Sequence, residues 1–335
     1  MQLARANFID DVTCKHEVQR VTKNRFKLLS KVATTKMSSV YLALDRKHSQ
    51  KVILKFLANA QCKNPKMRKR FNREANLGRS IDHPNVIKIR AKGLIKKRPF
   101  ILIDYIDGQT LGEIRKEREI PIKECIRYLI EAAQGLQAIH SSGLVHRDIK
   151  PENLMLGKDG KVLITDLGLM TQYGTEVSKL TETNELMLSP LFASPEHARG
   201  KTVDWRSDIY SLGATFYYLL TGTYPYMGKS PVDTLLMHIS LPLPPMSARN
   251  PRLPEELIQV IEKMMNKNPR KRHANCTELV AELEALLKEN CKSSGHSFSF
   301  KRPTKAKQAS VKNLLLSSVI AIVFVATFAI LHTIL

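Results

Sequence analysis

The sequence is poor in cysteine, in aromatic residues and, over its first third, in acidic residues. Its 335 residues include 5 cysteines, none in a C-x-x-C pair, which excludes a disulfide-stapled scaffold and gives no zinc-binding pattern. Aromatic residues make up 6% of the chain, too few to suggest a surface that stacks nucleic-acid bases. No apolar run follows the first arginine, so we expect no secretory signal peptide. With 43% hydrophobic and 25% charged residues, the chain is typical of a globular protein.

The shortage of acidic residues is local. Residues 1–100 carry 25 basic and 6 acidic side chains, a net charge of +19 out of +22 for the whole chain. The basic residues of this part include a cluster at Lys63, Lys66, Arg68, Lys69, Arg70 and Arg73. No nucleic-acid recognition module accompanies the cluster, so we expect a solvated face, or a docking surface for acidic partners or anionic lipid, rather than a nucleic-acid interface.

Only the C-terminus has a long hydrophobic run. Residues 314–335 contain no formally charged side chain, and as a helix they would span about 33 Å, enough for a bilayer core of about 30 Å. We expect a transmembrane helix here, with a buried core helix as the alternative. Five basic residues in 301–312 precede the run, which predicts a tail-anchored protein with residues 1–313 in the cytoplasm. Residues 289–313 would form a basic juxtamembrane linker.

The middle of the chain changes from strand-like to helical patterns. Short apolar runs at residues 40–44, 51–57, 85–89 and 100–106 indicate strands. A helical stretch is expected at 67–80, and from residue 105 onward the patterns are mostly helical, for example at 122–142 and 209–222. We predict an α+β fold at 26–288, after an N-terminal extension at 1–25, with a β-rich lobe at 26–104 and a larger helical lobe at 105–288.

The candidate catalytic residues lie in the segment LVHRDIKPENLML at 144–156 and in Asp166-Leu167-Gly168, which follows it. Phosphoryl transfer needs a carboxylate to orient a hydroxyl nucleophile, and oxygen ligands to hold Mg²⁺ on the phosphates. Asp148 suits the first task, and Asn153 and Asp166 suit the second. Lys150 adds a cation that can neutralise charge on the transferring group.

These residues closely resemble the catalytic loop and metal-binding motif of eukaryotic-type serine/threonine protein kinases, H-R-D-x-K-x-x-N and D-F-G. The resemblance implies the two-lobed kinase fold, ATP and Mg²⁺ as cofactors, with Mn²⁺ as an alternative ion, and proteins with Ser or Thr as substrates. Lys55 in VILK matches the lysine that holds the nucleotide phosphates, and Glu74 its ion-pair partner. The short DIKPEN and DLGL segments, without long inserts, resemble bacterial members.

The resemblance also assigns supporting residues. Glu196, in Ser-Pro-Glu for A-P-E, would pair with Arg272, and Asp208 would brace the catalytic loop. Ser189 would lie beside the acceptor hydroxyl. The nucleotide pocket would comprise Ala33, Thr35, Ser38, Val40, Ile53, Ile103 as gatekeeper, the hinge from Asp104 to Ile106, and Met155.

Phosphorylation is expected to regulate the enzyme. Arg147 adjoins Asp148, and members with this arginine are often activated by a phosphate in the activation segment. We therefore expect autophosphorylation at Thr181 and Thr183, with a kinase dimer for reaction in trans.

The hairpin that should cover the nucleotide departs from the family. The family reads G-x-G-x-x-G-x-V, whereas residues 33–40 read ATTKMSSV and lack all three glycines. We expect hydroxyl groups of this hairpin to face the phosphates, and nucleotide use weakened by about ten-fold. Ile53 would narrow the adenine slot. The alternative is a membrane-bound pseudokinase scaffold with weak or no catalysis.

Overall fold

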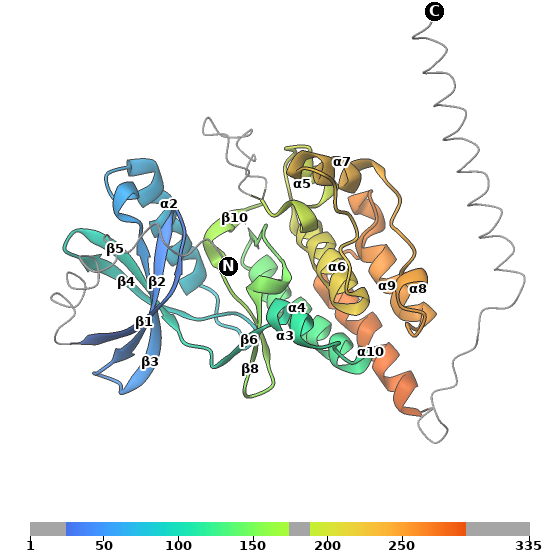
Figure 1. The fold of residues 1–335 in the computed structure, drawn as a ribbon, viewed down its shortest axis with the longest axis horizontal. Coiled ribbons are helices and arrows are strands. Elements are labelled where there is room, and N and C mark those ends of the chain that lie inside the picture. The colour runs from blue at the N-terminus through green and yellow to red at the C-terminus, as the bar shows by residue number, and fades with distance from the viewer. Residues whose placement is uncertain (1–24, 174–187, 293–335) are drawn as a thin grey trace, which may run out of the picture. The chain divides into compact units, whose positions relative to one another are not determined.

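A computed structural model describes residues 25–173 and 188–292 of the protein. They form a β-rich small lobe and a helical large lobe (Figure 1). The α+β, two-lobed prediction is confirmed. The predicted span at 314–335, the residues Thr181 and Thr183, and the extension 1–24 lie outside the described residues.

The small lobe is an antiparallel five-stranded sheet in the order β1-β2-β3-β5-β4. Its strands are β1 (Phe26–Thr34), β2 (Ser38–Asp45), β3 (Gln50–Leu57), β4 (Ile89–Ile95) and β5 (Arg98–Asp104). Alternate side chains of β2 and β3 enter one core, in which Tyr41, Leu54 and Phe56 are buried, as the two-residue period of a strand requires.

One long helix packs against this sheet, α2 (Pro65–Arg79), after the short 3₁₀ turn η1 (Asn59–Gln61) (Figure 1). The side chain of Asn64 caps α2 by accepting hydrogen bonds from the backbone N–H groups of Lys66 and Met67. Gly78 lies on its buried face, where a Cβ atom would stand 2.4 Å from a methyl carbon of Ile89 and 2.9 Å from one of Leu167. A larger residue at 78 would therefore displace the side-chain ends of Ile89 and Leu167, where α2 packs closely against β4 and the start of η3.

The large lobe is built around α6 (Trp205–Thr221), which is buried from Ser207 to Leu220. Such a helix, covered on all sides, is typical of the centre of a large core. The other helices are α3 (Leu111–Glu117), α4 (Ile122–Ser141), α5 (Pro195–Ala198), α7 (Pro231–Ser240), α8 (Met246–Arg249), α9 (Glu255–Met264) and α10 (Cys276–Lys292).

Short strands and 3₁₀ turns connect the helices of the large lobe. The strands are β6 (Gly108–Thr110), β7 (Leu144–Val145), β8 (Leu154–Gly157), β9 (Val162–Ile164) and β10 (Thr171–Gln172). The 3₁₀ turns are η2 (Pro151–Asn153), η3 (Leu167–Leu169), η4 (Pro190–Phe192) and η5 (Pro269–Lys271).

One strand prediction is wrong. Residues 85–88 are not a strand of the small-lobe sheet, since β4 begins at Ile89. The apolar run is buried because Val86 bridges Ile164 of the large lobe, and Ile87 donates its backbone N–H to the Ile164 carbonyl. A short apolar run alone does not distinguish a strand from such a buried connection.

Within 25–173 and 188–292, no helix combines the length and apolar character needed to cross a membrane.

Candidate active site

The catalytic loop between β7 and β8 is fixed by one buried carboxylate. Asp208, 0% exposed on α6, accepts hydrogen bonds from the backbone N–H groups of His146 and Arg147, each at 2.8 Å. Its Oδ2 also lies 2.9 Å from Nε2 of His140 on α4. Burial alone would raise the pKa of Asp208, but the bond from His140 and the loop amides hold this pKa below its usual value. Arg147 has a φ of 72°, a strained conformation that such bonds can maintain.

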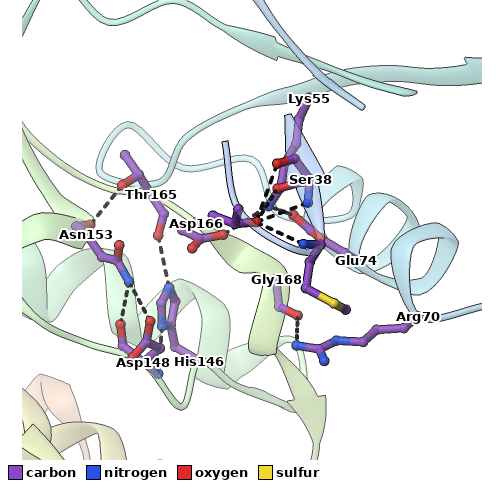
Figure 2. Close-up of polar contacts among 12 residues, drawn as sticks. Ser38, Lys55, Arg70, Glu74, His146, Asp148, Asn153, Thr165, Asp166 and Gly168 are labelled. Atoms are coloured by element: carbon purple, nitrogen blue, oxygen red, sulfur yellow. Dashed lines mark hydrogen bonds and ion pairs between the residues drawn. The ribbon is translucent and has the colours of Figure 1, made fainter. Parts of the chain in front are cut away.

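The carboxylate of Asp148 accepts hydrogen bonds from three side chains, of which Figure 2 shows the bond from Asn153. Its Oδ2 accepts hydrogen bonds from Nζ of Lys150 at 2.7 Å and from Nδ2 of Asn153 at 3.0 Å. Its Oδ1 accepts one from the hydroxyl of Ser189 at 2.7 Å, and Lys150 also donates to that hydroxyl at 3.0 Å. A carboxylate held this way can accept a proton from a hydroxyl group in the position that Ser189 now occupies.

The small lobe contributes Lys55 of β3 and Glu74 of α2. The Nζ atom of Lys55 lies 2.7 Å from Oε1 of Glu74 and 3.1 Å from Oδ1 of Asp166. Burial alone would lower the pKa of Lys55, but these two carboxylates raise it well above its usual value. The ion pairs therefore join a strand, a helix and the metal-binding motif at one point (Figure 2).

Asp166 and Asn153 are suited to hold a divalent ion. The Asp166 side chain is 51% exposed, and the charge of Lys55 is the main cause of its lowered pKa, so it is an anion near neutral pH. Asn153 directs its Nδ2 to Asp148, which leaves its amide oxygen as a ligand. Two oxygen donors are few for a complete site, but Mg²⁺ is usually held by one or two side chains together with substrate phosphates and water. The donor set therefore fits Mg²⁺ that arrives with a nucleotide.

The carboxylates of Asp166 and Glu74 leave little space for a side chain at position 168, which is a glycine. A Cβ atom there would stand 3.2 Å from Oδ1 of Asp166 and 3.3 Å from Oε2 of Glu74. A side chain at 168 would thus press on both carboxylates. The Gly168 carbonyl accepts a hydrogen bond from Arg70 of α2 at 3.4 Å.

The predicted support pair is also present. Nη1 and Nη2 of Arg272 donate to Oε1 and Oε2 of Glu196 at 2.7 and 2.9 Å. The Arg272 side chain is 0% exposed, and Ser207 of α6 adds a 2.5 Å bond to the same carboxylate. This two-point ion pair links α5, which carries Glu196, to the end of η5, and the bond from Ser207 links α5 to α6.

The predicted nucleotide pocket lies along β2, β3, β5 and β8. Val40 pairs with Lys55 in the β2–β3 register, and Ile53 pairs with Ile103 in the β3–β5 register. These three apolar residues and Met155 are only partly buried, as expected for the lining of an open cleft rather than for core. Ala33 and Thr35 are exposed, whereas Ser38 is buried.

The first residue of the predicted hinge, Asp104, already forms hydrogen bonds within the protein. The backbone N–H of Asp104 donates to the Lys88 carbonyl at 3.0 Å, so this amide is not available to a ligand. The Asp104 carboxylate is bound by Arg90 at 2.6 and 2.7 Å. Asp104 and Ile106 also line a cavity of about 470 Å³, which Lys55 and Asp148 do not line.

Three histidines of the site, His140, His146 and His197, were not assigned roles from the sequence. The contact of His140 with Asp208 is described above. His146 accepts the Asp148 backbone N–H on Nδ1 at 3.3 Å, and its Nε2 lies 3.2 Å from the Thr165 carbonyl, which joins the catalytic loop to the residue before Asp166. The third, His197, lies with Nε2 3.2 Å from Nη2 of Arg147. Only the position of His146 beside Arg147 and Asp148 gave a signal, because the other contacts join distant segments.

Comparisons with known proteins agree with this geometry. The family model for the protein kinase domain matches residues 26–283. The chain belongs to the protein kinase domain family. A probable serine/threonine-protein kinase of Clostridium perfringens is 34% identical over 273 residues, 81% of this chain and 40% of that protein. The serine/threonine-protein kinase PknB of Mycobacterium tuberculosis is 35% identical over 253 residues, 74% of this chain and 40% of PknB.

Solved structures share the fold of this kinase domain. The PknI kinase domain of Mycobacterium tuberculosis superposes with a TM-score of 0.62 at 24% identity, over 79% of this chain and 96% of the PknI chain. The chain spans 40% of the length of the curated relatives described above. The prediction of a protein kinase domain is thereby confirmed, and the relatives described above are bacterial serine/threonine-protein kinases.

Proposed function

We propose that the protein transfers the γ-phosphoryl group of ATP to serine and threonine hydroxyls of proteins. The observation that carries the proposal is the position of Asp148, whose carboxylate accepts hydrogen bonds from Lys150, Asn153 and a hydroxyl group. The ion pairs of Lys55 with Glu74 and Asp166 support it. The names of the relatives, serine/threonine-protein kinases, support the substrate class.

The chain's own residues account for each requirement of the reaction. The acceptor hydroxyl takes the place of the Ser189 hydroxyl on Asp148, its oxygen forms a bond to the γ-phosphorus, and its proton passes to the Asp148 carboxylate. The bond from the γ-phosphorus to the bridging oxygen of ADP breaks. Lys150, 2.7 Å from Asp148, neutralises charge on the transferring group, and Lys55 holds the remaining phosphates. Mg²⁺, held by Asn153 and Asp166 when ATP binds, would neutralise the phosphate charge.

The alternative function, a pseudokinase scaffold, is not favoured. A scaffold needs none of Lys55, Glu74, Asp148, Asn153 and Asp166, yet all five are present. Lys55 contacts Glu74 and Asp166, and Asn153 contacts Asp148. The largest departure from the family is in the nucleotide hairpin, where the backbone rather than side chains would contact phosphate.

The test is transfer of labelled phosphate from Mg·ATP to the protein itself and to a generic Ser/Thr substrate. Wild type is expected to form phosphoserine or phosphothreonine, and Asp166→Ala to form none while remaining folded. Equal labelling of both proteins would contradict the assignment. Absence of both labelling and ATP binding in wild type would favour the scaffold.

We also propose that Thr181 and Thr183 are phosphorylated in trans within a kinase dimer. Arg147 supports this: burial lowers its pKa, the charge of Asp208 raises it, and the charges of Arg70 and Arg73 lower it. A phosphate nearby would add a negative charge to this group of arginines. Mass spectrometry after incubation with ATP should find phosphate at one of the two threonines. Failure of the wild type to label an inactive Asp166→Ala chain mixed with it would contradict reaction in trans.

The third part of the proposal is a tail anchor at 314–335 with the kinase domain in the cytoplasm, aided by anionic lipid at the basic small lobe. It is supported by the uncharged run, the basic residues before it, and the cationic side chains of α2. The full chain should remain with membranes after a high-salt wash, whereas a chain ending at residue 313 should be released. Charge reversal at Lys63, Lys69 and Arg73 should weaken binding to vesicles rich in anionic lipid; unchanged binding would remove the lipid part alone.

A further inference from the structure

The tip of the β1–β2 hairpin is closed by one threonine hydroxyl. The Oγ1 atom of Thr35 accepts hydrogen bonds from the backbone N–H groups of Met37 at 3.2 Å and Ser38 at 3.0 Å. The backbone N–H of Thr35 donates to the Ser38 carbonyl at 2.8 Å. Two successive amides of the tip therefore converge on a single side-chain oxygen.

This tip is part of the site. Ser38 begins β2, and β2 pairs with the strand that carries Lys55, with Val40 opposite Lys55. Figure 2 shows Ser38 on the same side of the site as Lys55 and Glu74. Thr35 is exposed, whereas Ser38 and Ser39 are 8% and 9% exposed. Thr35 directs its oxygen to the tip's own amides. The expectation that the hairpin hydroxyls face the phosphates stays a prediction.

Converging backbone N–H groups are the usual means by which a loop binds phosphate oxygens. In this hairpin the amides that could bind a phosphate already hold a hydroxyl oxygen. A phosphate oxygen is charged and bonds to an amide more strongly than a neutral hydroxyl does, so it can displace Thr35, but part of its binding energy is lost in the exchange.

We propose that Thr35 is a positioning residue that caps the phosphate-binding amides of the nucleotide-free enzyme, and that ATP must displace its hydroxyl to bind. The side chain competes with the nucleotide phosphates and leaves the adenosine part unaffected. The inference rests on the proposed use of ATP, and it gives the glycine-free hairpin a specific effect on nucleotide affinity.

Calorimetric titration with Mg·ATP and with adenosine tests the inference on the full chain. Thr35→Val removes the oxygen and keeps the branched shape, and we expect its Kd for ATP to fall about three- to ten-fold. The Kd for adenosine should not change. In turnover, KM for ATP should fall by a similar factor. Thr35→Ser, which keeps the hydroxyl, should behave as wild type, and Thr34→Val, at the adjacent position, is the matched control.

Each other outcome overturns the inference. Weaker ATP binding by Thr35→Val would show that the hydroxyl builds the tip for phosphate. Unchanged ATP binding would show that the cap has no cost, and equal tightening of ATP and adenosine would show a general change in the cleft. If wild type binds adenosine but gains nothing from the phosphates of ATP, the inference fails for lack of a phosphate site. If wild type binds ATP and only the Thr35 effect is missing, the proposed function stands without it.

Discussion

The catalytic loop and the nucleotide hairpin use the same device with different strength. In each, two successive backbone N–H groups bond to one side chain: His146 and Arg147 to Asp208 in the large lobe, and Met37 and Ser38 to Thr35 in the small lobe. Asp208 is a buried carboxylate and Thr35 an exposed hydroxyl. Charge-assisted bonds in a buried setting are about twice as strong as neutral ones. The loop that carries Asp148 is therefore held by strong bonds, whereas the tip of the hairpin is held by weaker ones that a ligand could replace.

The largest effect is expected when the strong cap is weakened. Asp208→Asn keeps the shape of the side chain but replaces one acceptor oxygen by an NH₂ group, so one loop amide or His140 loses its partner in the core. We expect the free energy of unfolding to fall by about 4 kcal/mol, with a loss of activity of at least about a hundred-fold as Asp148 shifts. Denaturant unfolding and a phosphate-transfer assay measure both quantities.

A matched change on the same helix serves as control. Asp204 caps α6 through a 2.8 Å bond from the Arg206 backbone N–H, and asparagine caps helices equally well. Asp204→Asn should therefore change little. Similar losses in both variants would show that charge at this end of α6, and not the cap on the catalytic loop, is responsible.

The pH dependence of stability tests the buried surroundings of the catalytic loop through His197, which contacts the Arg147 side chain. Burial, together with the charge of Arg147, lowers the pKa of His197 to about 4, while an unfolded histidine has a pKa of about 6.5. Between these values the unfolded chain binds more protons, so stability falls as the pH drops from 6.5 to 4. His197→Gln can still accept from Arg147 and should escape a loss on the order of 3 kcal/mol. Parallel stability profiles of variant and wild type would contradict the neutral, buried state of His197.

The Glu196 pair with Arg272 tests whether buried charge elsewhere in the large lobe matters equally. Glu196→Gln keeps the shape but removes the charge from a two-point ion pair with a fully buried arginine. We expect a stability loss of about 2 to 3 kcal/mol. The surface pair of Glu119 with Arg252, half exposed or more on both sides, is the control, and Glu119→Gln should cost less than about 1 kcal/mol. A smaller loss at Glu196 than at Glu119 would refute the role of burial.

The smallest effect is expected at the weak cap. Thr35→Val should change the free energy of unfolding by less than about 0.5 kcal/mol, because water can replace the hydroxyl at an exposed tip. Denaturant unfolding beside the Asp208→Asn variant measures this directly. A loss at Thr35 comparable to that at Asp208 would remove the distinction between the two caps.

The sequence predicted the lobes and the site because its motifs keep a fixed order. Lys55, Glu74, Asp148, Asn153 and Asp166 lie far apart along the chain, and only their resemblance to a family gave reason to bring them together. In the structure Lys55 contacts Glu74 and Asp166, and Asn153 contacts Asp148. The roles of single side chains within this cluster remain predictions for the experiments above.

What the sequence did not predict depends on contacts between distant segments. Residues 85–88 have a strand-like pattern, but their apolar side chains are buried against the large lobe. The acceptor role of His197 arises only because α5 is folded next to the catalytic loop. At the hairpin tip, the hydroxyl of Thr35 could face either a ligand or the backbone of its own turn, and the sequence does not distinguish these two directions. In the structure it accepts hydrogen bonds from the backbone of Met37 and Ser38.

The most direct test of the account is the rate of phosphoryl transfer by Asp148→Asn at saturating Mg·ATP, measured together with ATP affinity. Because the amide cannot accept the hydroxyl proton, the account predicts a rate about 10²- to 10⁴-fold lower, with ATP affinity and folding unchanged. A rate within a few-fold of wild type would contradict the assignment of Asp148 and with it the proposed mechanism.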